Sequence, residues 1–151
     1  MMEAAARSAT AHPRIATPLR ILAAVMGLVD LITGGWALVD PAGWYRSYPG
    51  FGHHWISVQG PYNEHMALDA GAGFVAVGAI LVVAAVWANR STLTVALLAL
   101  VVHSLPHFLF HLTHHVEGFS AFDTLFGVWS LGVEALLGLI LMWAVWRPRR
   151  A

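Results

Sequence analysis

The sequence predicts an all-α integral membrane protein, built as one bundle of four transmembrane helices. Of its 151 residues, 58% are hydrophobic and only 11% are charged, whereas about 45–50% of an ordinary soluble domain is apolar. The apolar residues form four runs, each close to the roughly 20 residues that a helix needs to cross about 30 Å of hydrocarbon. A soluble bundle would instead need a polar stripe along every helix, and the second run offers only Asp69.

The first transmembrane helix is expected at residues 21–39, after a basic cytoplasmic tail at residues 1–18. It is a permanent span rather than a signal peptide, because it contains Asp30 and has no small-residue cleavage site before the Asp40–Pro41 turn. Residues 40–65 follow and are rich in glycine, proline and aromatic residues. This segment is too long for a plain connector, so we expect it to cap the outer end of the bundle.

The other three helices are expected at residues 66–88, 93–112 and 124–146, with no second domain in the 151 residues. A tight turn joins the second helix to the third, and a short outer loop joins the third to the fourth. Small residues recur at four-residue spacing in the second helix. This spacing lets a neighbouring helix approach closely, and the two pairs are Ala67 with Gly71 and Ala72 with Ala76.

The arginines predict the orientation of the bundle. The eight basic residues are all arginine, and only Arg46 lies in the long loop. The positive-inside rule therefore places both termini in the cytoplasm. The basic C-terminal end is expected to contact anionic lipid head groups of the bilayer and is too short to indicate nucleic-acid binding. The absence of cysteine excludes disulfides and thiolate metal sites.

The histidines gather at the predicted outer face. On the third helix, His103, His107 and His111 recur every four residues and therefore form one stripe along the helix. Pro106 lies inside this stripe, where it frees a backbone carbonyl and can bend the helix. All but one of the nine histidines belong to the outer side: His53, His54, His65, His103, His107, His111, His114 and His115.

Imidazole and carboxylate groups at this level predict a transition-metal site. His65 and Asp69 lie one turn apart on the second helix, as His107 and His111 do on the third. Nitrogen and oxygen ligands of this kind suit zinc, iron, copper or manganese. We expect these four residues to be the ligands, with Glu64 and His114 behind them. The alternative is that the histidines only form hydrogen bonds between helices.

Three ionisable residues lie near the middle of the predicted membrane: Asp30, His103 and Glu134. A charge at that depth costs on the order of 2.5–3.5 kcal/mol, so these groups should face the bundle interior and be protonated or bind a cation. One interpretation is that Asp30 and Glu134 form a proton relay with His103. The other is a neutral acid pair that serves packing.

Two segments carry a resemblance to a known family. Residues 60–65 with Asp69 and Gly71, and residues 105–115, resemble a family of small, functionally uncharacterised four-span bacterial membrane proteins. The resemblance implies architecture and a multi-pass location in a bacterial cytoplasmic membrane, but no reaction. The histidine spacing of 107–115 also resembles the histidine boxes of membrane di-iron hydroxylases and desaturases. Those boxes lie on several cytoplasmic helix ends, so this second resemblance implies only shared ligand chemistry.

Several functions therefore remain open. The first is a metalloprotein that binds zinc, iron or copper at the outer site. The second is a haem b or quinone protein in which His65 acts with His107 or His111 across the bundle, with His103 deeper as a further cofactor-binding residue. The third is a proton-coupled carrier or an accessory subunit of a larger membrane complex, which would require assembly such as a homo-oligomer. No nucleophile triad or phosphate-binding loop is present, so no catalytic residue or enzyme class is assigned.

Overall fold

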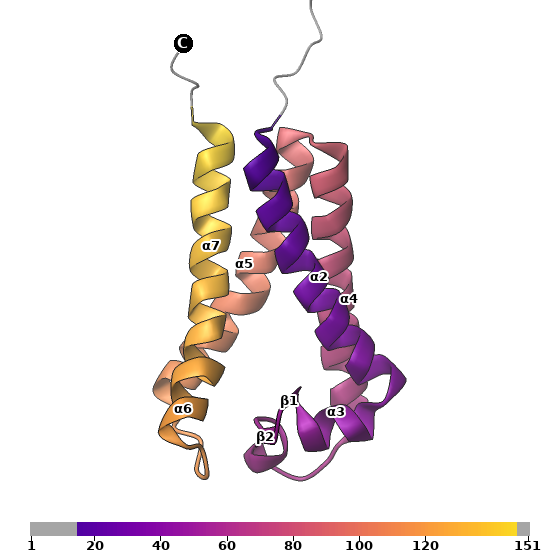
Figure 1. Ribbon diagram of the computed structural model, residues 1–151, viewed down its shortest axis with the longest axis vertical. Coiled ribbons are helices and arrows are strands. Elements are labelled where there is room, and N and C mark those ends of the chain that lie inside the picture. Colours follow the sequence, from indigo (N-terminus) through magenta and orange to yellow (C-terminus); the bar gives the residue numbers. More distant parts are fainter. Residues whose placement is uncertain (1–14, 148–151) are drawn as a thin grey trace, which may run out of the picture.

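Four long helices dominate the computed structural model, which describes residues 15–147 (Figure 1). Each of the four is long and apolar enough to cross a membrane, which confirms the predicted multi-pass membrane protein. They are α2 (Thr17–Val39), α4 (Glu64–Trp87), α5 (Arg90–Thr113) and a last span made of α6 (Ala121–Asp123), η2 (Thr124–Val128) and α7 (Trp129–Trp146). Most of the basic N-terminal tail, together with Arg149 and Arg150, lies outside the described residues.

Capping residues explain why several helices begin earlier than the apolar runs suggest. The Asn63 side chain accepts a hydrogen bond from the Met66 amide at 3.1 Å, and the Asn89 side chain accepts one from the Thr92 amide at 3.2 Å. These bonds satisfy backbone N–H groups that a helix start leaves free. The turn before α5 is tight because Ala88 adopts the left-handed conformation, with φ of 55°.

Helices α2 and α4 pack closely because glycines meet at two levels. A Cβ atom added to Gly34 would lie 2.5 Å from the Gly71 carbonyl oxygen, and one added to Gly78 would lie 2.5 Å from that of Gly27. No real side chain tolerates such a contact, so the two backbones approach as only glycine permits.

The small-residue prediction for the second span is therefore half right. Ala67 and Gly71 are buried in the bundle, as expected. Ala72 and Ala76 are exposed on the opposite face of α4, so this second pair does not pack against a helix. The four-residue spacing alone could not distinguish the face that meets α2 from the face that meets lipid.

The main apolar core lies in the half of the bundle that contains the start of α2 and the end of α7, here called the terminal end. Leu81 of α4, Leu93 and Leu97 of α5, and Leu141 of α7 are almost completely buried there. From this end α2 and α4 run together, while α5 and α7 run together and diverge from them toward the opposite, loop end (Figure 1). Pro106 does not terminate α5, which continues to Thr113.

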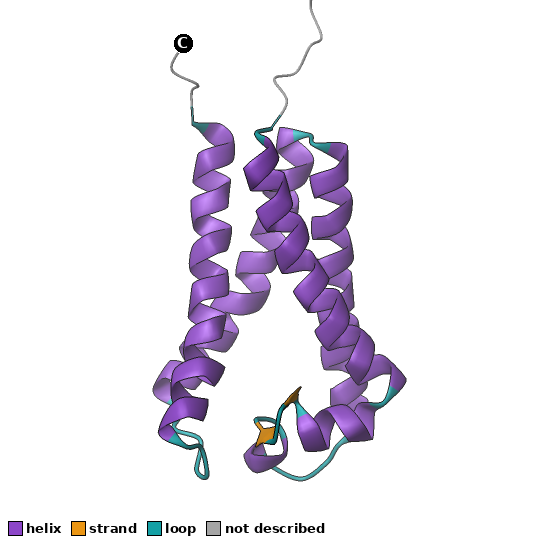
Figure 2. Cartoon of the chain, viewed as in Figure 1, coloured by secondary structure: helices purple, strands orange, loops and turns teal. Residues whose placement is uncertain are grey.

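Residues 40–63 form a compact segment at the loop end (Figure 2). It contains the short helix α3 (Pro41–Ser47), the antiparallel strands β1 (Pro49–Gly50) and β2 (His53–His54), and the 3-10 turn η1 (Ser57–Gln59). The indole of Trp44 is buried against Ala37 and Ala67 of the helices. The Tyr45 hydroxyl closes the segment by donating to the Gly60 carbonyl at 2.5 Å.

Candidate functional site

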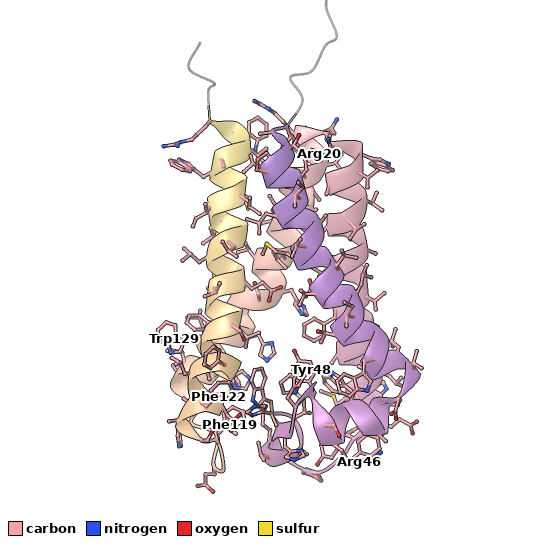
Figure 3. All side chains as sticks on the ribbon, in the orientation of Figure 1. Arg20, Arg46, Tyr48, Phe119, Phe122 and Trp129 are labelled. Carbon is pink, nitrogen blue, oxygen red and sulfur yellow. The ribbon has the colours of Figure 1, made fainter. Side chains whose placement is uncertain are left out.

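A cavity of about 260 Å³ lies at the loop end, between the diverging helix pairs and the 40–63 segment. We call it the loop-end cavity. Most of its wall is aromatic or aliphatic, and every long helix contributes to it. Figure 3 shows Tyr48 between the two helix pairs. The aromatic lining residues are Trp44, Tyr48, Trp55, Phe74 and Phe119, and the polar ones are Thr33, Gln59, His107, His111 and Ser130.

Two histidines of α5 meet on the wall of this cavity. The Nε2 atoms of His107 and His111 are 3.1 Å apart, so one imidazole donates to the other or both face a common partner. The Phe110 ring lies edge-on to His111. The Nδ1 atom of His111 is buried and has no hydrogen-bond partner among residues 15–147. The pair thus presents polar nitrogen atoms to a mainly apolar cavity.

The other expected metal ligands lie elsewhere. His65 and Asp69 pair with each other, Nε2 to Oδ2 at 3.3 Å, and their side chains are 83% and 63% exposed. Neither lines the loop-end cavity. Glu64 is exposed at the start of α4, and the exposed His114 stacks on Phe110 with ring centroids 4.2 Å apart.

The expected meeting of ligands from two helices is therefore not found. Within the part of the chain that the structure describes, no three histidine, aspartate or glutamate side chains form a group that could hold a metal ion. The physical reason lies in α4, where His65 and Asp69 occupy the exposed first turns. Sequence spacing placed them correctly one turn apart but could not show which way that face points.

The mid-membrane acids do come together. Asp30 of α2 is only 2% exposed, and the carboxyl group of Glu134 from α7 lies next to it. One Asp30 oxygen has no hydrogen-bond partner among the described residues. His103 instead packs its ring edge-on against Phe74, with centroids 4.8 Å apart.

Tyr48 connects the cavity to this acid pair. Burial raises the pKa of the Tyr48 phenol above its ordinary value; the nearby Glu134 and Asp30 carboxylates raise it further, and the Thr33 hydroxyl lowers it. Tyr48 therefore remains a protonated hydroxyl at any physiological pH. Tyr48 and Thr33 both line the cavity, so hydroxyl groups of the cavity wall lie near the two acids.

A polar cluster around Asp123 was not anticipated from the sequence. The Asp123 carboxylate contacts His53 Nδ1 at 2.6 Å and accepts hydrogen bonds from Trp55 Nε1 at 2.9 Å and from Ser120 Oγ at 2.6 Å. The Phe122 ring stacks on His53. These contacts fasten the 40–63 segment to α6. The only local signal was the Ser120-x-x-Asp123 pattern of a capping box, which the structure contains.

The fourth span contains a π-helical segment beside the cavity, which sequence analysis also missed. Gly127 and Val128 of this segment line the cavity. A Cβ atom on Gly127 would lie 3.4 Å from the Trp55 indole, an ordinary van der Waals distance, so the indole lies next to this segment. Such π-helical turns occur frequently at functional sites. No sequence pattern predicts them, which is why sequence analysis did not find this one.

Comparisons with known proteins leave the family open. The resemblance to four-span bacterial membrane proteins, most specific in residues 60–65 with Asp69 and Gly71 and in residues 105–115, therefore stays a prediction from the sequence. Any inference about function therefore has to come from the fold and from the residues that line the loop-end cavity. No protein-family model, no curated protein and no solved structure matches this chain significantly.

Proposed function

We propose that the protein binds a small lipophilic ring compound of the quinone class in the loop-end cavity. The observation that carries the proposal is the cavity itself, about 260 Å³ of mainly aromatic wall with a histidine pair on one side. Ligand sites are typically apolar clefts in which a few polar groups fix orientation. A quinone matches this pattern, because it has a flat apolar ring and two carbonyl acceptors.

The polar groups of the wall are suited to hold those carbonyl oxygens. His107 and His111 supply ring N–H donors from α5, and the protonated Tyr48 hydroxyl is a donor from the 40–63 segment. A hydrogen bond contributes about 1 kcal/mol net, and the larger effect is the cost of leaving a buried polar group unpaired. Donors on separate elements therefore favour a ligand with an acceptor at each end.

The acid pair adds a role for the deeper residues. Asp30 and Glu134 lie near Tyr48, and they have no lysine or arginine near them in the sequence. Two adjacent carboxylates without a cation are unfavourable in a membrane. We propose that the pair holds a proton that it exchanges with the cavity through the Tyr48 hydroxyl.

Ligand binding is tested with detergent-purified protein and a short-chain ubiquinone or menaquinone analogue. Trp44 and Trp55 line the cavity, so a bound quinone should quench tryptophan fluorescence saturably. His111→Leu should weaken binding about tenfold by removing one hydrogen bond and leaving a carbonyl unpaired. His114→Leu is the matched control, because His114 is an exposed histidine on the same helix end. Absence of saturable quenching, or equal losses in both variants, would refute the proposal.

A transition metal at His107 and His111 is the second candidate. Two imidazole nitrogens bound to one tetrahedral zinc ion at about 2.0–2.1 Å lie roughly 3.3 Å apart, and the observed separation is 3.1 Å. The remaining coordination positions would have to be filled by groups other than histidine or carboxylate. Elemental analysis decides this point: about one zinc, iron or copper per chain, lost in His107→Leu but kept in His65→Leu, is the expected result.

The haem and carrier alternatives are less well supported. A haem held by two histidines across the bundle would need His65 opposite His107 or His111, and His65 is not among the residues that line the cavity. An absorption spectrum with a Soret band would restore this alternative. A carrier role would use Asp30, His103 and Glu134 as its proton relay, and loss of a measured transport activity in Asp30→Asn would be its supporting result.

A further inference from the structure

A second, smaller recess of about 50 Å³ lies at the opposite end of the bundle from the loop-end cavity. We call it the terminal recess. Its charged lining residues are Arg90, the first residue of α5, and Arg147, which directly follows α7. The rest of its wall is aliphatic and comes from the start of α2 and the last turn of α7. The recess therefore combines two guanidinium groups with an apolar floor.

Arg90 has an unused donor at this point. Its Nε atom is buried and has no hydrogen-bond partner among residues 15–147. Arg20, at the same end of the bundle (Figure 3), is different: its Nε donates to the Ala85 carbonyl at 2.8 Å and its Nη2 to the Val86 carbonyl at 3.4 Å. A buried donor without an acceptor is costly. The contrast indicates that the Arg90 guanidinium can bind an acceptor from outside the described residues.

The electrostatic surroundings of the recess favour an anion. The first turns of both α2 and α5 lie at this end, and the positive ends of their helix dipoles attract negative charge. No side chain caps the start of α2. No aspartate or glutamate occurs in the neighbouring stretches 15–29, 70–116 and 135–147. Nothing in these stretches therefore neutralises Arg90 and Arg147.

The recess lies where lipid head groups are expected. The guanidinium carbon of Arg147 sits 3.4 Å above the Trp143 ring, and the Trp146 indole donates to the Thr94 hydroxyl at 2.8 Å. Indoles and arginines at the end of a transmembrane helix are typical of the head-group level. A phosphate diester at this depth would meet two guanidinium groups, which bind phosphate through paired N–H donors.

We propose that the terminal recess binds the phosphate group of an anionic membrane phospholipid. Arg90 and Arg147 hold the phosphate oxygens, and the aliphatic wall contacts the glycerol backbone and first acyl carbons. The same guanidinium groups would also attract free phosphate. The aliphatic wall is the reason to expect the lipid instead, because a free phosphate ion makes no favourable contact with it.

The test uses the full chain in detergent with three additives: phosphatidylglycerol, phosphatidylcholine and inorganic phosphate. Phosphatidylglycerol should raise the thermal unfolding midpoint, and native mass spectrometry should show it retained in preference to phosphatidylcholine. Arg90→Gln with Arg147→Gln should weaken that retention by at least about tenfold, because each arginine contributes to attraction for anionic lipid. Arg46→Gln, at the loop end, is the matched control and should retain the lipid fully.

Each other outcome counts against the proposal. Equal stabilisation by inorganic phosphate and by phosphatidylglycerol would mean an anion site without lipid selectivity. Unchanged lipid retention in the double variant would mean that the recess is not the site. If the double variant does not fold, Arg147→Gln alone provides the comparison, because Arg147 is exposed; it should still reduce retention several-fold, and no reduction would overturn the proposal.

Discussion

Polar side chains inside the bundle differ in whether they have a hydrogen-bond partner. Ser104 is fully buried, yet its hydroxyl donates to the Leu100 carbonyl one turn back and needs no other partner. His103 and His111 each keep a buried ring nitrogen without a partner among the described residues. Buried polar groups in native proteins are normally paired. The two unpaired imidazoles therefore stand out as groups that can accept a ligand or a water molecule.

Asp123 allows a test at this scale. Its carboxylate accepts from Trp55 and Ser120 and contacts His53, which together hold the 40–63 segment against α6. Asp123→Asn removes the negative charge and one acceptor oxygen, so we expect the thermal midpoint to fall by a few degrees. Quenching by quinone should also weaken, because Trp55 lines the cavity. Differential scanning fluorimetry measures the first effect, with the exposed Glu117→Gln as control; equal midpoints in the two variants would contradict this role.

Among the helix contacts, the close packing of α2 against α4 depends most on glycine, which has no side chain. The two glycine contacts, Gly27 with Gly78 and Gly34 with Gly71, are seven residues apart on each helix and hold the pair together over two turns. Hydrophobicity does not drive helix association in lipid, so close van der Waals packing of this kind has to do so. The α2–α4 pair thus supplies a rigid wall against which the cavity forms.

The α2–α4 contact is tested by two alanine substitutions on adjacent residues. A methyl group on Gly34 would collide with backbone and Cβ atoms of α4, whereas one on Gly35 meets nothing within 4 Å. We expect Gly34→Ala to destabilise the bundle by about 1–3 kcal/mol and Gly35→Ala to be neutral. Reversible unfolding in mixed micelles provides the measurement. Equal stability of the two variants would show that the close approach is not required.

Helix α5 shows how far sequence patterns reach at this scale. The four-residue histidine spacing correctly predicted that His107 and His111 share a face, because the helical period fixes that result locally. The predicted meeting of these histidines with His65 and Asp69 also required the face of α4 that carries His65 and Asp69 to point toward α5, and it does not. Local periodicity does not contain this information, since rotation of α4 is set by its glycine contacts with α2.

Taken as a whole, the molecule has two chemically different ends. Among the described residues, the terminal end carries the main apolar core with Arg20, Arg90 and Arg147, while the loop end carries the cavity, most histidines and most acids. The positive-inside rule predicts that the terminal end faces the cytoplasm. The loop-end cavity would then open toward the outer leaflet, where lipophilic ligands and the external medium both reach it.

The orientation is tested by cysteine labelling, which is clean because the chain has no native cysteine. Ser91→Cys places a thiol in the first turn of α5, at the terminal end, and Glu117→Cys places one in the loop before α6; both positions are exposed. In intact cells, a membrane-impermeant maleimide should label Glu117→Cys at once and Ser91→Cys only after permeabilisation. The reverse pattern would overturn the predicted topology.

The sequence by itself determined that this chain has four membrane spans and where they lie, because the length and apolarity of a span are local properties set by the bilayer thickness. It also determined which residues carry polar chemistry and which share one helix face. Only the tertiary structure decided which faces meet. It brought Asp30 next to Glu134 and His53 next to Asp123, and it placed Tyr48 on the wall of the loop-end cavity. It left His65 and Asp69 exposed. The physical reason is that the rotation of a helix follows from packing between segments far apart in the chain.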